Sequence, residues 1–351
     1  MMAIDFLSFV RDVASNPMLA VTTLLTLGVI LVNGWTDAPN AIATAVSTRA
    51  ISVRAAIALA AVMNFLGVFL MTMINATVAE TIFKMVDFGN DTHASIVGLC
   101  AAMFAIVVWA TAASRLGIPT SESHALIAGL SGAAIALHNS FSGINGSEWV
   151  KVLYGLLLSS VLGFLSGFVT TRLLSGLFRN RDRRNMANGF RKAQIGAAAG
   201  MAFMHGAQDG QKFMAVFMIG IFLNRGQTGT QSFIVPIWMM VICSLVMALG
   251  TSVGGYRIIK SVGMDMVKLE PYQGFAADLG ASASLLTAQL LGLPVSTTHT
   301  KTTAIIGVGA STRFSSVKWG IVGDMVMSWV LTFPFCGLIG YGMTKLFTAI
   351  F

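Results

Sequence analysis

Two short stretches place hydroxyl groups and a histidine behind a glycine and a proline. They read GIPTSESHA at residues 117–125 and GLPVSTTHT at residues 292–300. Their prolines, Pro119 and Pro294, suit the first turn of a helix, whose N–H groups have no intrahelical partners. The Ser and Thr side chains that follow can cap those groups. Because the free N–H groups carry the positive end of the helix dipole, each stretch predicts a helix start that can bind an anion.

The hydroxyl groups of these stretches can donate hydrogen bonds to an anion without adding formal charge. In one stretch alone, ordinary helix capping explains the pattern equally well. Two copies that face each other favour an anion site. The predicted donors are Thr120, Ser121, Ser123, Ser296, Thr297 and Thr298.

Two further stretches each carry an aspartate within a long apolar run. NGWTDAPNAIATAVSTRA at residues 33–50 matches HGAQDGQKFMAVFMIGIF at residues 205–222, so that Asp37 aligns with Asp209 at an offset of 172. The two hydroxyl stretches align at an offset of 175. A carboxylate at membrane depth is costly, so each aspartate is a functional candidate. The alternative is a structural aspartate paired with a lysine.

The two carboxylates also predict a bound cation. They would repel an anionic substrate unless a sodium ion, a proton or a divalent metal binds with it. Neutral side-chain oxygens from Thr36, Asn40 and Gln208 can complete the shell of a hard cation around Asp37 and Asp209. We therefore expect the anion and a cation to be coupled.

Ionisable residues beside these motifs each allow two interpretations. Glu122 has no acidic counterpart in the second hydroxyl stretch and is either a proton site or a structural residue. His124 and His299 are either proton carriers, since imidazole titrates near neutral pH, or partners of the bent backbone, which is the favoured interpretation. Lys212 and Lys301 have no basic counterparts in the first half, and either one could pair with an aspartate.

The composition requires that these motifs lie in a membrane. Of 351 residues, 55% are hydrophobic and 10% are charged, whereas a soluble chain carries about 25% charged residues. Alternating strand patterns are absent, so the fold class expected is an all-α integral membrane protein. Asp278 and Asp324 also lie in apolar segments and receive no role. The ten expected membrane segments are 18–47, 53–79, 93–115, 118–138, 149–178, 194–223, 231–255, 272–292, 294–311 and 318–349.

The recurring motifs predict an internal duplication. We expect a first repeat over residues 1–178, a basic linker over 179–193 and a second repeat over 194–351. Each half crosses the membrane an odd number of times, so the second repeat must be inverted. Inverted repeats with re-entrant or half-helices are typical of secondary transporters.

The distribution of the net charge of +8 sets the expected orientation and requires no nucleic-acid partner. Basic residues concentrate in the linker RNRDRRNMANGFRK at 179–192, and short basic loops stay cytoplasmic. Both termini are then outside a multi-pass cell membrane, and residues 4–14 read as a short amphipathic helix at its surface. Loops on the same side as the linker carry Arg49, Arg54, Arg115, Arg257, Lys260, Lys268, Arg313 and Lys318.

Together the four stretches resemble the inorganic phosphate transporter (PiT) family. Its signature is a Gly-x-Asn-Asp-x-x-Asn-Ala motif in both halves, which is present here as GWTDAPNA and, altered, as HGAQDGQKF. The elements GIPTSESHALIAG and GLPVSTTHTKTTA match as well. Only the termini and the linker fall outside the resemblance.

The resemblance implies symport of inorganic phosphate with sodium or protons, no enzymatic activity, no cofactor and a homodimer. The implied phosphate ligands are Ser121, Ser123, Ser296, Thr297 and Thr298, with Thr120 close by, and Gln208 and Lys212 are further candidates. The implied cation or sodium-type site consists of Asp37, Asn40 and Asp209, with Thr36 beside it.

Departures from the signature point to the proton-coupled bacterial branch. The first Asn of the signature is Thr36 in one half and Gln208 in the other, and the second Asn of the second half is Lys212. A lysine ammonium there would fill a position where sodium-coupled relatives bind an ion. We therefore favour protons over sodium, with a neutral metal–phosphate complex as a candidate substrate.

Three alternatives compete with this interpretation. A transporter of sulfate or another tetrahedral oxyanion is the nearest, because hydroxyls and helix starts bind any such anion. A membrane-embedded hydrolase is disfavoured because G-x-S-x-G and H-E-x-x-H are absent. A channel would not require buried carboxylates in both halves.

Overall fold

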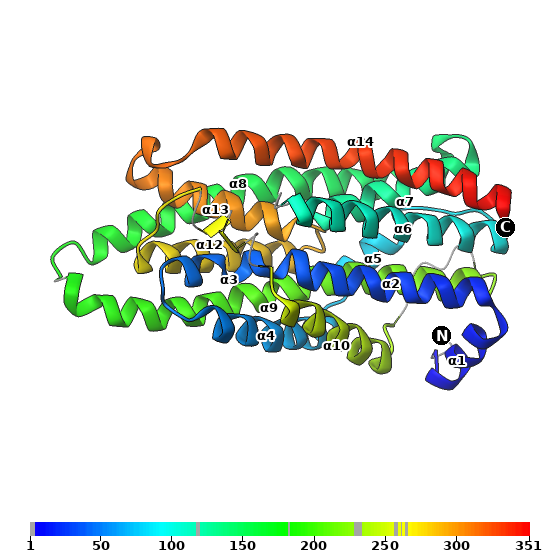
Figure 1. Ribbon diagram of the computed structural model, residues 1–351, viewed down its shortest axis with the longest axis horizontal. Coiled ribbons are helices and arrows are strands. Elements are labelled where there is room, and N and C mark those ends of the chain that lie inside the picture. The colour runs from blue at the N-terminus through cyan, green and yellow to red at the C-terminus, as the bar shows by residue number, and fades with distance from the viewer. Residues whose placement is uncertain are drawn as a thin grey trace.

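The computed structural model describes residues 4–116, 120–181, 183–227, 234–255, 259–260, 262–263 and 266–351. These residues form an elongated bundle whose main helices run along one axis (Figure 1). The prediction of an all-α fold is confirmed.

Every predicted segment contains a helix. The first half holds α1 (Phe6–Ser15), α2 (Pro17–Thr36), α3 (Ala38–Ser47), α4 (Val53–Ile74), α5 (Thr77–Phe83), α6 (Thr92–Leu116), α7 (Glu122–His138) and α8 (Gly146–Leu177). The second half holds α9 (Arg183–Asn224), α10 (Ile237–Val253), α12 (Pro271–Leu290), α13 (Thr297–Thr312) and α14 (Trp319–Ile350). The predicted surface helix is α1. The basic linker is largely helical, because α9 begins at Arg183.

Five helical spans of the described chain are long and apolar enough to cross a bilayer. They are Pro17–Ser47, Val53–Ile74, Thr92–Ala113, Gly146–Leu177 and Trp319–Ile350. The first of them is interrupted at Asp37, which separates α2 from α3. The first aspartate motif lies in this interrupted span, and the other three motifs lie in α7, α9 and α13.

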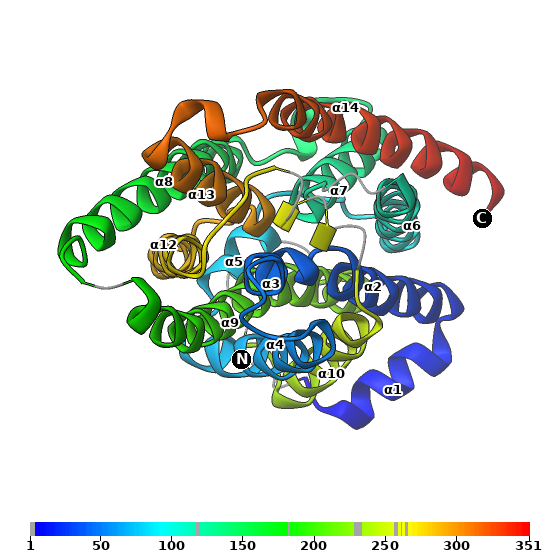
Figure 2. The ribbon, with the colours of Figure 1, turned by 60° about the vertical axis from the view of Figure 1, so that its left-hand side comes forward.

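The two halves of the chain interlock. Helix α4 packs along α9 while α10 packs along α2, and α8 packs along α13 while α14 packs along α7. Figure 2 shows α3, α7 and α13 toward the middle of the bundle. Almost every residue of these three helices is buried, including their polar side chains. The polar motifs are therefore held inside the bundle and away from its lipid-facing surface.

Two glycines of the repeated motif permit close helix packing. A Cβ atom on Gly34 would lie 2.8 Å from the backbone nitrogen of Thr251 in α10. A Cβ atom on Gly206 would lie 2.9 Å from the Cα atom of Asn64 in α4. Since Gly34 and Gly206 are matched positions, the repeat preserves the same helix contact in each half.

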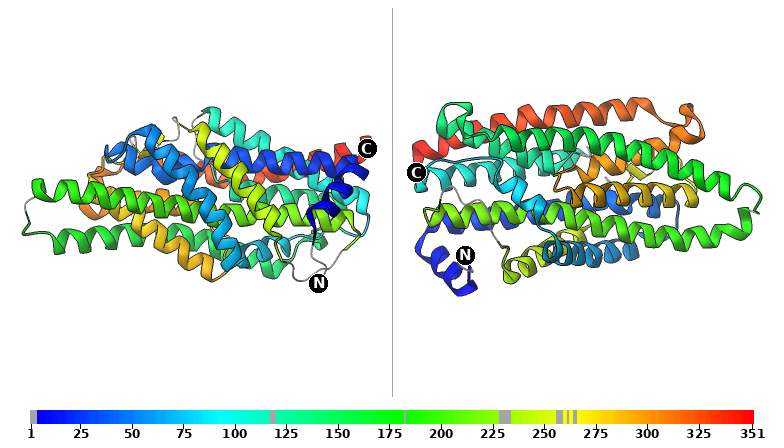
Figure 3. Two further views of the ribbon diagram at one scale, coloured as in Figure 1. Left: turned by 90° about the horizontal axis from the view of Figure 1, so that it is seen from below. Right: turned by 180° about the vertical axis from the view of Figure 1, so that it is seen from behind.

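The ends of the chain and the basic connection lie at opposite ends of the bundle. The C-terminal part of α8 and the start of α9 extend beyond the other helices (Figure 1). Both termini lie at the other end, as two further views show (Figure 3). At the end of the bundle where the termini lie, α1 packs against α10, because Phe9 stacks on Trp238 with ring centroids 4.9 Å apart.

Candidate functional site

A break between two helices positions the first aspartate. Helix α2 ends at Thr36, Asp37 follows it, and α3 begins at Ala38. Pro39 in the first turn of α3 has no N–H group and cannot continue the hydrogen-bond ladder of α2. The junction places the Asp37 carboxylate in the interior, where it is only 3% exposed.

The second aspartate lies within an unbroken helix. Helix α9 runs continuously through His205, Asp209 and Lys212. Residues four and three positions apart lie on the same helix face, so these side chains point to one side. All three are buried. The matched motifs are therefore built differently, with a junction in the first half and a continuous helix in the second.

Both hydroxyl stretches start a helix in the same way. The Ser121 hydroxyl caps α7 by accepting a hydrogen bond from the His124 N–H at 3.3 Å. The Ser296 hydroxyl caps α13 by accepting from the His299 N–H at 3.2 Å. Capping is therefore real in both copies. It remains compatible with anion binding, because an accepting hydroxyl keeps its own proton for donation.

The start of α13 contacts the first aspartate. The Thr298 hydroxyl donates to Asp37 Oδ1 at 2.7 Å. Asn40 on α3 donates to the same carboxylate oxygen at 3.3 Å and to Thr298 Oγ1 at 3.1 Å. The helix start of the second half thus contacts the carboxylate of the first.

Both helix starts converge on the second aspartate. Ser123 of α7 donates to Asp209 Oδ1 at 3.4 Å, and Thr297 of α13 donates to Asp209 Oδ2 at 3.1 Å. Asn33 of α2 donates to Oδ2 at 3.4 Å. The structure therefore brings the two hydroxyl stretches and the two aspartate motifs together.

Lys212 joins the two helix starts through its ammonium group. Its Nζ atom donates to Asp209 Oδ1 at 2.7 Å, to Ser123 Oγ at 2.7 Å and to the Val295 carbonyl at 2.6 Å. The lysine, which is fully buried, places a positive charge between the starts of α7 and α13. Of the two lysines considered as partners for an aspartate motif, Lys212 is the one that contacts Asp209.

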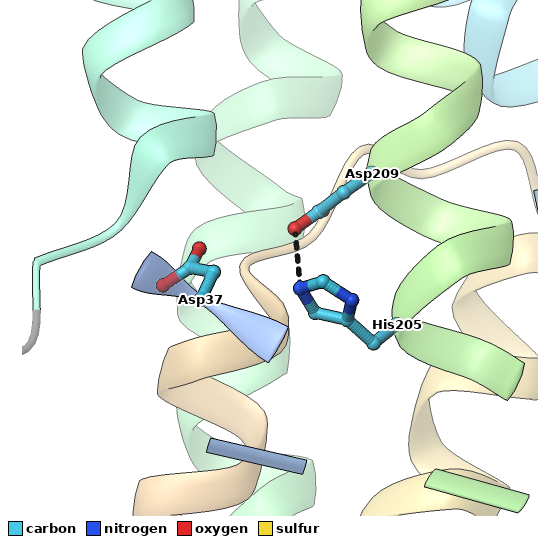
Figure 4. A group of neighbouring side chains, drawn as sticks. All are labelled: Asp37, His205 and Asp209. Atoms are coloured by element: carbon cyan, nitrogen blue, oxygen red, sulfur yellow. Dashed lines mark ion pairs between the residues drawn. The ribbon is translucent and has the colours of Figure 1, made fainter. Parts of the chain in front are cut away.

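Asp37, His205 and Asp209 form a compact cluster of potential cation ligands (Figure 4). One ligand atom from each lies within 4.8 Å of the others. His205 Nε2 is 3.4 Å from Asp209 Oδ2, and His205 Nδ1 is 2.8 Å from Asn64 Oδ1, which orients the ring. Two carboxylates and an imidazole are a ligand set suited to a divalent cation.

Buried oxygen atoms without a hydrogen bond also fit a cation or polar substrate. A buried acceptor that is left unpaired costs free energy, so a group of them calls for a partner from outside the chain. Within the described residues, the unpaired side-chain oxygens of these motifs are Asn33 Oδ1, Asn40 Oδ1, Glu122 Oε2 and Gln208 Oε1.

The remaining candidate residues beside the two helix starts are also buried. A hydrogen bond joins the Thr36 hydroxyl to the Glu122 carboxyl group, so α2 contacts the first turn of α7. Thr120 is buried just ahead of the Ser121 cap. Both amide atoms of Gln208 are buried without a hydrogen bond inside the described chain. Pro119 lies outside the described residues.

Lys301 belongs to a different buried cluster. Its ammonium forms an ion pair with Asp278 of α12 and donates to Thr44 Oγ1 of α3 at 3.0 Å. Thr44 in turn donates to Asp278 at 2.7 Å. All three side chains are fully buried. Lys301 is therefore paired with Asp278, for which the sequence suggested no role, and joins α13 to α12 and α3.

The rings of the two motif histidines meet edge to face. The ring centroids of His124 and His299 are 4.3 Å apart. Both ring nitrogens of His124 and Nε2 of His299 are buried, and none makes a hydrogen bond to a side chain of the described residues. The interpretation of both histidines as partners of the backbone stays a prediction, and the main-chain N–H of His124 takes part in the cap of α7.

Sequence reasoning missed two residues of the site. Asn33 and His205 both contact Asp209 but received no role. They are the first residues of the matched stretches and align at the same offset of 172. Extending the comparison of the repeats by one position beyond the glycine would have identified both.

Comparisons with known proteins relate the chain to one family. Residues 33–340 match the Phosphate transporter family. The probable low-affinity inorganic phosphate transporter of Bacillus subtilis is 37% identical over 309 residues, which cover 88% of this chain and 91% of that protein. The protein of the same description from Rhizobium meliloti is 39% identical over 308 residues, covering 88% and 90%.

A solved structure shares the fold. It is described as the sodium-dependent phosphate transporter and superposes with a TM-score of 0.87, covering 96% of this chain and all of its own. The sequences are 22% identical. At this level of identity the similarity establishes a common architecture.

Proposed function

Because the chain belongs to the phosphate transporter family, we propose that it imports inorganic phosphate across the cell membrane by symport with a cation, with protons favoured over sodium. The relatives are transporters and not enzymes. Their names specify phosphate, and no comparison supports sulfate as the substrate.

The phosphate would bind between the starts of α7 and α13. Two helix N-termini there supply N–H groups and positive dipole ends. Hydroxyl donors come from the caps and the first turns of both helices, and Lys212 adds a full positive charge. The fully buried carboxamide of Gln208 has unpaired groups that could complete the anion's hydrogen bonds. These features support recognition of a small tetrahedral oxyanion.

The contact between Lys212 and Asp209 is the observation that carries the preference for protons. The ammonium lies 2.7 Å from the carboxylate and neutralises its charge. A sodium ion at the same carboxylate oxygen would have to displace this ammonium. Because the Lys212 side chain itself supplies a positive charge at Asp209, no sodium ion is needed to neutralise this carboxylate.

The cluster of Asp37, His205 and Asp209 supports a metal–phosphate complex as the transported species. The cluster lies beside the proposed phosphate position, since Thr298 and Thr297 contact its two carboxylates. A divalent cation bound to phosphate removes charge from the anion, so the complex would enter this acidic cluster more readily than free phosphate.

The arrangement of the helices supports an inverted repeat. The most extensive contacts between the halves have counterparts under exchange of the repeats, as in the pairs α4 with α9 and α10 with α2. The basic α8–α9 connection and the two termini lie at opposite ends of the bundle, which agrees with a cytoplasmic linker and external termini (Figure 1).

Competition for uptake tests the substrate. Proteoliposomes that contain the purified protein should accumulate labelled phosphate, and unlabelled phosphate should suppress this uptake. Unlabelled sulfate at the same concentration should have little effect. Adding a divalent chelator should reduce uptake if the metal–phosphate complex is the transported species. Equal suppression by sulfate and phosphate would refute the proposed specificity.

A further inference from the structure

Two histidines from opposite halves of the chain meet beside the proposed phosphate position. His124 and His299 occupy the third position of α7 and α13, directly after Ser123 and Thr298. Their rings meet edge to face with centroids 4.3 Å apart, and each side chain is less than 5% exposed. The matched positions of the two anion stretches therefore bring two imidazoles into contact.

These rings have unused capacity to bind a proton. Both nitrogens of His124 and Nε2 of His299 are buried and make no side-chain hydrogen bond within the described residues. A buried polar group without a partner is costly, so a structural role alone gives no reason to place two imidazoles here. In the first-half stretch, the histidine contributes to the helix cap only through its main-chain N–H.

The surroundings can stabilise one positive charge on the pair. Trp329 of α14 stacks on His299 with ring centroids 3.7 Å apart, and Phe333 of α14 lies 4.7 Å from His124. An aromatic face attracts a cation such as imidazolium. Two imidazolium ions in contact would repel each other, so the pair is suited to one proton and not two.

Charged groups around the pair make its protonation sensitive to phosphate. The Lys212 ammonium of α9 donates to Ser123, the residue before His124, and a positive charge there disfavours a second one nearby. Lys301 of α13 is neutralised by Asp278, and Glu122 of α7 is engaged with Thr36. A phosphate anion at the adjacent helix starts would offset the charge of Lys212 and supply a counter-charge for imidazolium.

We propose that His124 and His299 together form a binding site for one proton, which fills when phosphate binds between the starts of α7 and α13. This inference rests on the proposed proton-coupled symport. Proton and phosphate then favour each other's binding by the same factor, as any pair of coupled ligands must. The pair provides a physical link between the anion and the proton gradient that drives its uptake.

Proton uptake on phosphate binding tests the inference without transport. Detergent-purified protein in weakly buffered solution is mixed with phosphate adjusted to the same pH, and a pH indicator follows the proton balance. The wild-type protein should take up about one proton more per bound phosphate than the His124→Gln/His299→Gln double variant. The exposed His93→Gln variant is the control and should match the wild type. Trp329→Leu should move the half-point of proton uptake to lower pH.

Transport provides a second readout. In sodium-free proteoliposomes, a gradient of about one pH unit supports up to about tenfold accumulation for each coupled proton. The double variant should lose this accumulation but retain exchange of internal for external phosphate at equal pH. If the double variant folds poorly, the single variants His124→Gln and His299→Gln take its place. Each should lose accumulation driven by the pH gradient and retain phosphate exchange at equal pH.

The outcomes separate this inference from the proposed function. If the wild type responds to the pH gradient and the histidine variants respond equally, the histidine site is refuted and proton symport stands. Loss of exchange together with accumulation in every folded histidine variant would assign the rings to phosphate binding and also refute the site. A wild type that ignores the pH gradient would refute the proton coupling, and the histidine site with it.

Discussion

The Lys212 ammonium lies 2.7 Å from the Asp209 carboxylate, and both side chains are fully buried. The same ammonium contacts α7 through Ser123 and the segment before α13 through the Val295 carbonyl. One side chain therefore links the acidic cluster, which is suited to a cation, to the two helix starts, which are suited to an anion. Under the proposed symport, this link would connect substrate recognition to the choice of coupling ion.

Replacing Lys212 should change the coupling ion. Lys212→Asn removes the ammonium that neutralises Asp209 and introduces the oxygen ligand present at the matched position, Asn40. Phosphate uptake by this variant should become more dependent on external sodium than uptake by the wild type. Initial rates measured with sodium or choline as the external cation provide the comparison.

The partly exposed Lys84→Asn variant is the control for this substitution, because it removes a lysine outside the site. It should behave like the wild type. A Lys212→Asn protein that binds phosphate but shows no added sodium dependence would contradict the assignment of Lys212 to a cation position.

The same ion pair should govern stability in a non-additive way. Asp209→Asn leaves the Lys212 ammonium buried without a counter-charge, and breaking a buried pair in this way costs about 3–5 kcal/mol. Lys212→Met should leave the carboxylate unpaired at a similar cost. The double variant should unfold at a higher temperature than either single variant, because neither charge remains.

Thermal unfolding in detergent measures this double-mutant cycle. The double variant should remain inactive in phosphate uptake despite its recovered stability. If the double variant loses as much stability as the two single variants together, the two groups do not interact in the folded protein.

The hydroxyl groups at the helix starts should control phosphate affinity. Ser123→Ala and Thr298→Val each remove a hydroxyl that donates to a carboxylate in this structure and that would turn its single proton to a bound phosphate. A hydrogen bond to a charged group contributes about 1.5–3 kcal/mol, so the KM for phosphate should rise about 10- to 100-fold. Concentration-dependent uptake measures the change.

Ser311→Ala is the matched control for these two substitutions. Its hydroxyl is also buried in α13 but donates to the Val308 carbonyl in the last turn, far along the helix from its start. An equal rise in KM for all three variants would indicate a general loss of packing and would contradict the assignment of the helix starts to phosphate.

The Lys301–Asp278 pair should act on the fold and not on substrate choice. Asp278→Asn removes the counter-charge of a fully buried ammonium and should lower the unfolding temperature markedly. The Lys301→Met/Asp278→Leu variant should be more stable than Asp278→Asn. Glu148→Gln, which affects an ion pair with the half-exposed Lys151, is the control and should have little effect. A stable Asp278→Asn protein with altered ion dependence would instead place this cluster in the coupling pathway.

Much of the fold could be predicted from the sequence because apolar length and motif recurrence are local properties. The apolar runs around Asp37 and Asp209 predict their segments. The capping residues Ser121 and Ser296 predict the two helix starts. The break between α2 and α3 was not predicted. Its cause is visible in the sequence, because Pro39 follows Asp37 by two residues.

The contacts between distant segments could not be predicted. Asp278 lies in an ordinary apolar segment, and its pairing with Lys301 depends on how α12 packs against α13. The position of Trp329 over His299 likewise depends on the path of α14. A single sequence contains no periodicity that reports such pairings, so these partners emerge only from the packed bundle.

The most direct test of the coupled mechanism is phosphate accumulation under separately imposed ion gradients. Proteoliposomes are prepared with a pH gradient and no sodium, or with a sodium gradient at equal internal and external pH. The pH gradient alone should drive labelled phosphate above its external concentration, and collapsing it with a protonophore should release the accumulated label. Accumulation that requires the sodium gradient and ignores the pH gradient would contradict the account.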